Sequence, residues 1–111
     1  MAVKNSVHAI ELASIASGSV SASYAVIDSS GIEKACFRLK VVNNSDKDVT
    51  VSFDGSTDHE YIVNATTEQF PAQDYAQPPN WVSLWPVGTK VYVKGVAGTG
   101  NIYLSGYYNE Q

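Results

Sequence analysis

Hydrophobic and polar residues alternate along much of this chain, most clearly between residues 32 and 53. The first half of this segment contains Phe37-Arg38-Leu39-Lys40-Val41-Val42, the second contains Val49-Thr50-Val51-Ser52-Phe53, and residues 43–48 between them are polar. Successive side chains of a β-strand point to opposite faces, so a period of two predicts strands with one buried and one solvated face. The polar residues suit a turn. The segment therefore predicts a long antiparallel hairpin, followed by a further turn at Asp54-Gly55.

The same pattern continues along the chain and predicts about eight short strands at near-regular spacing, with no convincing helix. Near the end, Val91 and Val93 are predicted to face inward, as are Ile102, Leu104 and Gly106, whereas Tyr103 and Tyr107 face the other way. Such spacing is typical of antiparallel sandwiches and jelly rolls. We expect an all-β fold: a single antiparallel β-sandwich, jelly-roll-like domain with an N-terminal arm.

The N-terminal part of the chain differs from the rest. Residues 14–23 are nearly all small, and small side chains bury little apolar area on folding. We therefore predict an N-terminal arm or loosely attached strand over residues 1–22 and a β-sandwich domain over residues 23–111. Two interpretations stay open here: a loose first strand, or an arm that becomes ordered only against a neighbouring subunit.

Composition limits the classes of partner. The net charge of −4 argues against nucleic acid, because phosphate binding needs a basic surface. There is no run of eighteen apolar residues and no export signal, so we expect a soluble protein with no membrane partner. Charged residues make up only 16% of the chain, below the usual value of about 25%. A neutral surface fits a protein packed against others, and equally an ordinary β domain.

Residues suited to catalysis are scarce. The chain has two histidines, His8 and His59, and one cysteine, Cys36, which excludes an internal disulfide. An acidic turn, with Asp54 followed by further carboxylates, lacks the alternating oxygen ligands of a known calcium loop. We therefore predict that the chain is not an enzyme and has no catalytic residue, cofactor or metal site.

Candidate contact residues come from two groups. Five of the seven basic residues lie in the blocks 34–40 and 90–94, which would form a basic side if the two strands share an outer face. Aromatic residues gather in the last third, and such residues anchor interfaces or stack on sugars. For the face shared by Trp81 and Trp85 we favour the core. The candidate partner-contact residues are Lys34, Arg38, Lys40, Tyr75, Trp81 and Tyr107.

Several segments resemble a pattern that recurs in small virion proteins of tailed phages. The central one is Val49-Thr50-Val51-Ser52-Phe53-Asp54-Gly55-Ser56-Thr57-Asp58-His59, preceded by a segment with Leu39, Val41 and Asn43-Asn44-Ser45. A strand over residues 91–95 and a glycine- and tyrosine-containing end over residues 98–108 follow. With its length and small-residue arm, the chain is similar to the capsid decoration, or staple, proteins of short-tailed phages of the epsilon type.

That resemblance implies a jelly-roll-like β domain on the outside of the shell, with no catalytic residues. It would bridge neighbouring subunits of the major capsid protein and form a homodimer on the capsid surface. The expected location is the outer capsid surface of the virion, after synthesis in the host cytoplasm. Two alternatives remain: a carbohydrate-binding β-sandwich module, and a phage neck or tail component.

Overall fold

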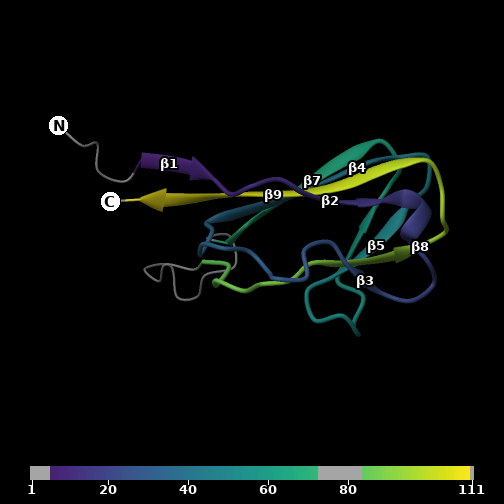
Figure 1. The fold of residues 1–111 in the computed structure, drawn as a ribbon, viewed down its shortest axis with the longest axis horizontal. Coiled ribbons are helices and arrows are strands. Elements are labelled where there is room, and N and C mark those ends of the chain that lie inside the picture. The colour runs from purple at the N-terminus through teal and green to yellow at the C-terminus, as the bar shows by residue number, and fades with distance from the viewer. Residues whose placement is uncertain (1–5, 73–83, 111) are drawn as a thin grey trace.

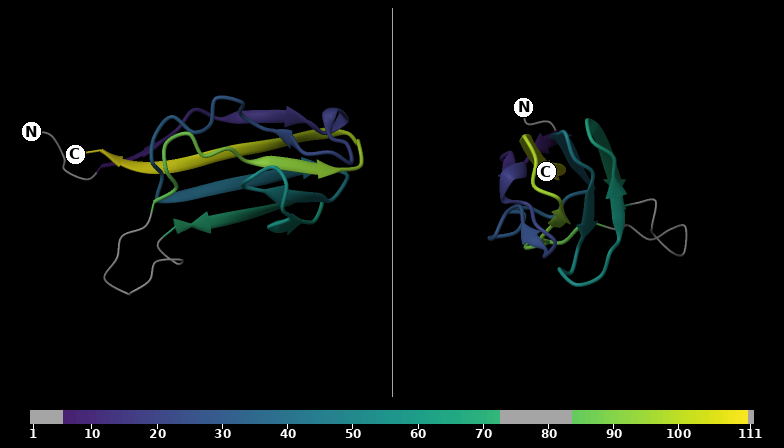
Figure 2. Two further views of the ribbon diagram at one scale, coloured as in Figure 1. Left: turned by 90° about the horizontal axis from the view of Figure 1, so that it is seen from below. Right: turned by 90° about the vertical axis from the view of Figure 1, so that its right-hand side faces the viewer.

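The protein is a β-sandwich of two antiparallel sheets packed face to face (Figures 1 and 2). The computed structural model describes residues 6–72 and 84–110. Within these ranges there is no α-helix, and η1 (Ser17–Ser19) is a 3-10 turn. No helix of the described part is long and apolar enough to cross a membrane. The all-β sandwich predicted from the alternation is confirmed.

Sheet A contains the longest strand, β9 (Gly100–Glu110), and each described strand of sheet B has four residues or fewer. In sheet A the order is β1-β9-β4-β7, and β2 also pairs with β9; the other strands are β1 (Ser6–Ala9), β2 (Ala13–Ala16), β4 (Arg38–Ser45) and β7 (Thr66–Pro71). In sheet B the order is β3-β8-β5-β6, with β3 (Ala25–Val26), β8 (Tyr92–Gly95), β5 (Val49–Ser52) and β6 (Glu60–Ile62).

The strand pairings are nested from the ends of the chain toward its middle. If β1 and β2 count as one interrupted strand, the first strand pairs with the last, β9, and the second, β3, pairs with β8. Next come β4 with β7 and, innermost, β5 with β6. Nested pairing of this kind is that of one long hairpin rolled into two sheets, which is the jelly-roll arrangement.

The predicted hairpin between residues 32 and 53 is wrong in its pairing. Its two strands, β4 and β5, belong to different sheets, and the chain crosses between them at residues 46–48. The strand also continues through residues 43–45, which were predicted as a turn, and Asn43 is fully buried there. The alternation is the same whether a strand pairs with the next strand in the sequence or the chain crosses to the facing sheet between them. It therefore does not reveal which strands pair with each other.

The core lies between the sheets, and the inward positions predicted for β8 and β9 are confirmed. Val91, Val93, Ile102, Leu104 and Gly106 are all buried. They pack with inward residues of the other strands and loops: Leu39, Val41, Val49, Val51, Ile62, Phe70, Ile27 and Ile32.

The segment predicted as an arm or loosely attached strand is hydrogen-bonded to β9 over two strands. Ala9 pairs with Tyr107 and Ala13 with Leu104, so residues 10–12 lie opposite only residues 105–106 and form a β-bulge. Ile10, Ser17 and Val20 of this segment are buried. Small side chains bury little area, but main-chain pairing attaches the segment. That it reaches a neighbouring subunit stays a prediction.

Candidate interaction surface

Three predicted contact residues come together on the outer face of sheet A. Because Leu39 and Val41 point into the core, Arg38 and Lys40 of β4 point outward. Arg38 pairs with Tyr107 of β9, and cross-strand partners lie on the same face. We call this surface the contact face; its described members are Arg38, Lys40, Val42, Gln69, Tyr103, Ser105 and Tyr107.

The cationic groups of the contact face interact with neutral partners. Arg38 Nη1 donates to Gln69 Oε1 at 2.6 Å. Lys40 Nζ donates to the Tyr107 hydroxyl at 3.4 Å and lies 5.8 Å from the centroid of its ring. Among the described residues neither cation pairs with a carboxylate. Their charges are therefore uncompensated within the described part of this molecule.

The charge of the contact face differs from that of the whole chain. The positions of β2, β4, β7 and β9 that share this face across the registers hold no Asp or Glu. The chain as a whole has a net charge of −4. A locally cationic sheet face with two half-buried tyrosines is suited to a complementary, acidic protein surface.

The structure places Lys34 on a different surface. Its Nζ lies 5.7 Å from the centroid of Tyr108, whose ring stacks on His8 at 5.5 Å. Tyr108 packs against the core and, by alternation, points to the opposite side of β9 from Tyr107. Lys34 therefore does not join Arg38 and Lys40.

The second basic block also lies elsewhere, which corrects the expectation of one shared basic side. Lys94 belongs to β8 of sheet B, where it pairs with Asp58 at 2.9 Å. Its Nζ lies 4.7 Å from the ring centroid of Tyr24, whose hydroxyl donates to Asp58. Desolvation and this hydrogen bond raise the pKa of Tyr24 to about 12. This cluster is internally neutralised, unlike the contact face.

The predicted aromatic contacts have different outcomes. Tyr75 and Trp81 lie outside the described residues. Trp85 stacks on Phe53 at 4.9 Å, and its Nε1 donates to Phe70 O at 2.7 Å, which confirms the core role predicted for that tryptophan. Tyr103 lies on the same side of β9 as Tyr107; it is not among the predicted contact residues, although the spacing of four residues along a strand already indicated a shared face.

Residues considered for catalysis or metal binding are engaged in the fold. The Cys36 side chain is fully buried, and burial, followed by the charge of Glu33, raises its pKa to about 11. His59 accepts a hydrogen bond from the Phe53 N–H through Nδ1. The carboxylate of Asp54 accepts hydrogen bonds from two N–H groups of its own turn and from Ser52 Oγ. In the described ranges no three His, Cys, Asp or Glu residues are grouped to hold a metal ion.

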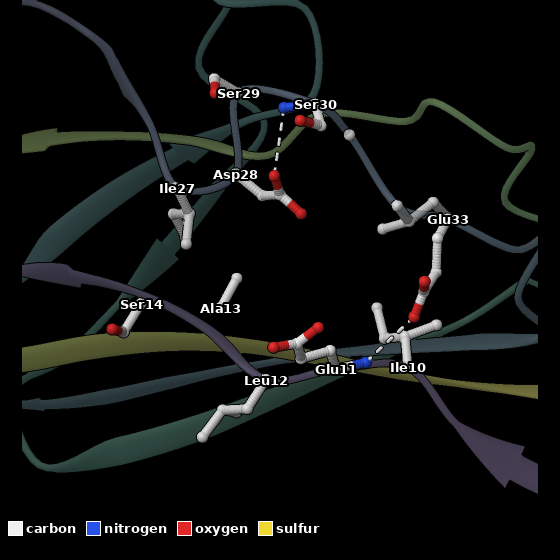
Figure 3. A pocket seen from close by; sticks show the side chains of 12 residues that line it. Ile10, Glu11, Leu12, Ala13, Ser14, Ile27, Asp28, Ser29, Ser30 and Glu33 are labelled. Atoms are coloured by element: carbon white, nitrogen blue, oxygen red, sulfur yellow. Dashed lines mark hydrogen bonds between the residues drawn. The ribbon is translucent and has the colours of Figure 1, made fainter.

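A cavity of about 480 Å³ opens between the bulge of residues 10–14 and the loop of residues 27–33 (Figure 3). Its wall contains the carboxylates of Glu11, Asp28 and Glu33, and we call it the acidic cavity. The Glu11 N–H donates to Glu33 Oε1 at 3.3 Å, and the Ser30 N–H donates to Asp28 Oδ1 at 3.1 Å. In the described part of the chain no cation pairs with these three carboxylates.

Comparisons with known proteins identify a shared fold and no family. No family model matches the chain, and no curated protein matches it. A chain from the solved structure of Bacillus endospore appendages, described as a novel family of disulfide-linked pili, is similar with a TM-score of 0.53. The similarity covers 98% of this chain and 93% of that chain at 13% sequence identity, so it shows the fold alone.

Proposed function

We propose that this chain is a structural protein of a tailed-phage virion, made in the host cytoplasm, which decorates the outer capsid surface and bridges subunits of the major capsid protein. The contact face is the observation that supports this proposal. Arg38 and Lys40 lie there with no carboxylate at the outward positions of the paired strands. Charges of this kind select and orient a partner. Tyrosines beside them supply amphipathic contact area.

The similarity to an appendage protein is compatible with a role for this chain in a repeating assembly. The disulfide linkage described for that protein, however, does not fit this chain. That protein is described as forming disulfide-linked pili. Here the sole cysteine, Cys36, is fully buried, and its Sγ donates to Lys34 O at 3.3 Å. Copies of this chain would therefore be held by non-covalent contacts, and many weak contacts suffice on a lattice because linkage raises the effective concentration.

Carbohydrate binding is the alternative from another functional class. Tyr103 and Tyr107 lie four residues apart on one strand face, a separation of about 13 Å. However, Lys40 already lies over the ring of Tyr107, and that face of the ring is not free to stack on a sugar. A glycan array that detects binding lost in Tyr103→Ala would favour this alternative over the capsid proposal.

A neck or tail component would have the same fold but would be present in a different number of copies per particle. Capsid decoration requires hundreds of copies in each particle, whereas a neck or tail position requires a few. Quantitative mass spectrometry of purified virions separates the two, and a count of a few copies would overturn decoration.

The contact face is tested by charge reversal. In the double variant Arg38→Glu and Lys40→Glu, we expect affinity for capsids that lack this chain to fall at least about tenfold, or about 1.4 kcal/mol. The matched control is Lys47→Glu with Lys90→Glu, which makes the same change in net charge at two exposed lysines outside the face. Co-sedimentation with capsids measures binding, and circular dichroism checks folding. Equal binding by both folded double variants would refute the assignment of the face.

A further inference from the structure

Arg38, the sole arginine of the chain, lies on the contact face at the start of β4. Its strand is paired on both sides, because residue 38 lies opposite Pro71 of β7 and opposite Tyr107 of β9. Strands of a sheet position side chains more precisely than loops do. The guanidinium group therefore projects from a rigid part of the fold.

The guanidinium group of Arg38 keeps donors for a ligand. Such a group carries five N–H donors in a planar fork. Its Nη1 donates to Gln69 Oε1 at 2.6 Å, and in the described part of the chain nothing accepts from the edge formed by Nε and Nη2. The amide oxygen of Gln69 orients the fork without neutralising it. The remaining edge has the geometry that binds a carboxylate through two parallel hydrogen bonds.

Lys40 and Tyr107 border the same point of the contact face. Tyr107 lies directly opposite Arg38, and Lys40 Nζ donates to the hydroxyl of this tyrosine at 3.4 Å. A phenol that accepts a hydrogen bond still has its own proton to donate. Two cations and one hydroxyl donor thus surround a point where the described outward positions supply no carboxylate.

The two cations repel each other in the free chain. Residues two apart on one strand face have Cα atoms about 7 Å apart, which is less than the screening length of about 8 Å at physiological salt. An anion between Arg38 and Lys40 removes this repulsion and is attracted by both groups. The site therefore suits a compact anionic group that only accepts hydrogen bonds, which describes an ionised carboxylate.

We infer that Arg38, Lys40 and Tyr107 form a carboxylate-binding site, which holds one Asp or Glu side chain of the protein that this chain decorates. The inference rests on the proposed function and identifies the chemistry of that contact. Arg38 binds both carboxylate oxygens, Lys40 contributes its charge and Tyr107 donates its hydroxyl proton. Val42 and Tyr103 form the next pair on the same face. Their apolar area is of use to a protein partner and not to a free anion.

A second copy of this chain is the competing source of carboxylates. Three carboxylates that lack a cation in the described ranges line the acidic cavity, which is a hollow between the bulge and a loop (Figure 3). In contrast, Arg38 and Lys40 are held near the sheet by hydrogen bonds to side chains of neighbouring strands. A flat face of this kind does not enter a hollow, which favours a different protein as the partner.

The variant Arg38→Lys keeps the charge and removes the bidentate geometry. We expect its affinity for capsids that lack this chain to fall about fivefold or more, the effect of one lost charge-assisted hydrogen bond. Lys47→Arg, the reverse exchange at an exposed lysine outside the face, is the matched control and should bind as the wild type does.

The outcomes separate this site from the proposed function. If Arg38→Lys binds as the wild type does while the double charge reversal weakens binding, the carboxylate site is overturned and the proposed function stands. If the wild-type chain does not bind capsids at all, both are overturned.

The hydroxyl of Tyr107 has its own test. Tyr107→Phe keeps the ring and removes the donor, so binding to the same capsids should weaken about two- to fivefold, the effect of one hydrogen bond. Tyr103→Phe makes the same change on the same face and should leave binding unchanged. Equal effects of the two variants would overturn the role of the Tyr107 hydroxyl.

The site is also testable on the free chain, without a capsid. Because the chain has one arginine, its Nε–Hε resonance in NMR spectra is unambiguous. Sodium acetate should move this resonance downfield, whereas sodium chloride at equal ionic strength should not. Gln69→Glu places a carboxylate beside Nη1 and should abolish the acetate shift. Val96→Glu adds the same charge at a position that is 66% exposed, and the shift should persist.

Equal shifts in acetate and chloride would overturn the carboxylate site, whatever the capsid assay shows. Sedimentation of the free chain tests the competing occupant. Self-association that Arg38→Lys abolishes would identify a second copy on this site and overturn its assignment to another protein.

Discussion

Replacement of Asn43 by alanine should strongly destabilise the fold, because this side chain joins the two sheets at the corner after β4. Asn43 is fully buried. Its Nδ2 donates to Lys47 O at 2.9 Å and to Ile62 O at 3.2 Å, and its Oδ1 accepts from Ser45 Oγ at 2.6 Å. Lys47 belongs to the corner and Ile62 to β6 of sheet B, so one amide stabilises the crossing and its neighbour.

The expected loss follows from these partners. Each net hydrogen bond contributes about 1 kcal/mol, and a buried carbonyl left unpaired costs about 1–3 kcal/mol. Lys47 O retains the Ser45 hydroxyl, at 3.0 Å, after the substitution. The three hydrogen bonds lost with the Asn43 amide together predict a loss of about 3 kcal/mol in the free energy of unfolding. This is a large part of the stability of a small domain.

Urea denaturation followed by tryptophan fluorescence measures this loss. With a slope of about 1.5 kcal/mol/M, the midpoint should fall by about 2 M and the slope should stay unchanged. The control is Asn44→Ala, at the exposed adjacent position, which should change stability by less than about 0.5 kcal/mol. If both variants lost the same amount of stability, or Asn43→Ala lost less than about 1 kcal/mol, the hydrogen bonds of the Asn43 amide would not contribute the expected stability.

Two further predictions concern particles and pH. If the chain cements a capsid by binding its assembled state, particles that lack it should release DNA at a lower temperature in a thermal release assay, and equal robustness would contradict cementing. Main-chain hydrogen bonds hold the pKa of Asp54 well below its ordinary value, and hydrogen bonds from Tyr61 and Tyr24 lower the pKa of Asp48 and Asp58. A lowered folded-state pKa contributes stability that is complete above the unfolded value of about 3.9 and is lost as the pH falls through the folded one. The urea midpoint should therefore fall from pH 5 toward pH 2, and less steeply in Asp54→Asn; an identical pH dependence in that variant would refute the role of Asp54.

Part of the candidate surface was accessible from the sequence. Alternation alone places Arg38 and Lys40 on the other face of their strand from Leu39 and Val41. It likewise places Tyr107 on the other face of its strand from the inward residues. It does not show that Arg38 lies beside Tyr107 or that Gln69 binds the guanidinium group, because β7, β4 and β9 are far apart in the chain. Lys34 was grouped with Arg38 through proximity in sequence, yet the chain turns between them and directs Lys34 toward Tyr108.

The sequence by itself determined that this is a β-sandwich and which face of many strands is buried, because side-chain direction alternates locally with each residue. The partner of each strand was decided only by the tertiary structure. The hydrogen bonds between strands are non-local, and the same alternation fits a hairpin or a crossing between sheets. Thus β4 pairs with β7 and β9 instead of β5, and the small-residue N-terminal segment becomes an edge of sheet A. Main-chain pairing, which leaves little trace in composition, places the contact face and the N-terminal segment on the same sheet.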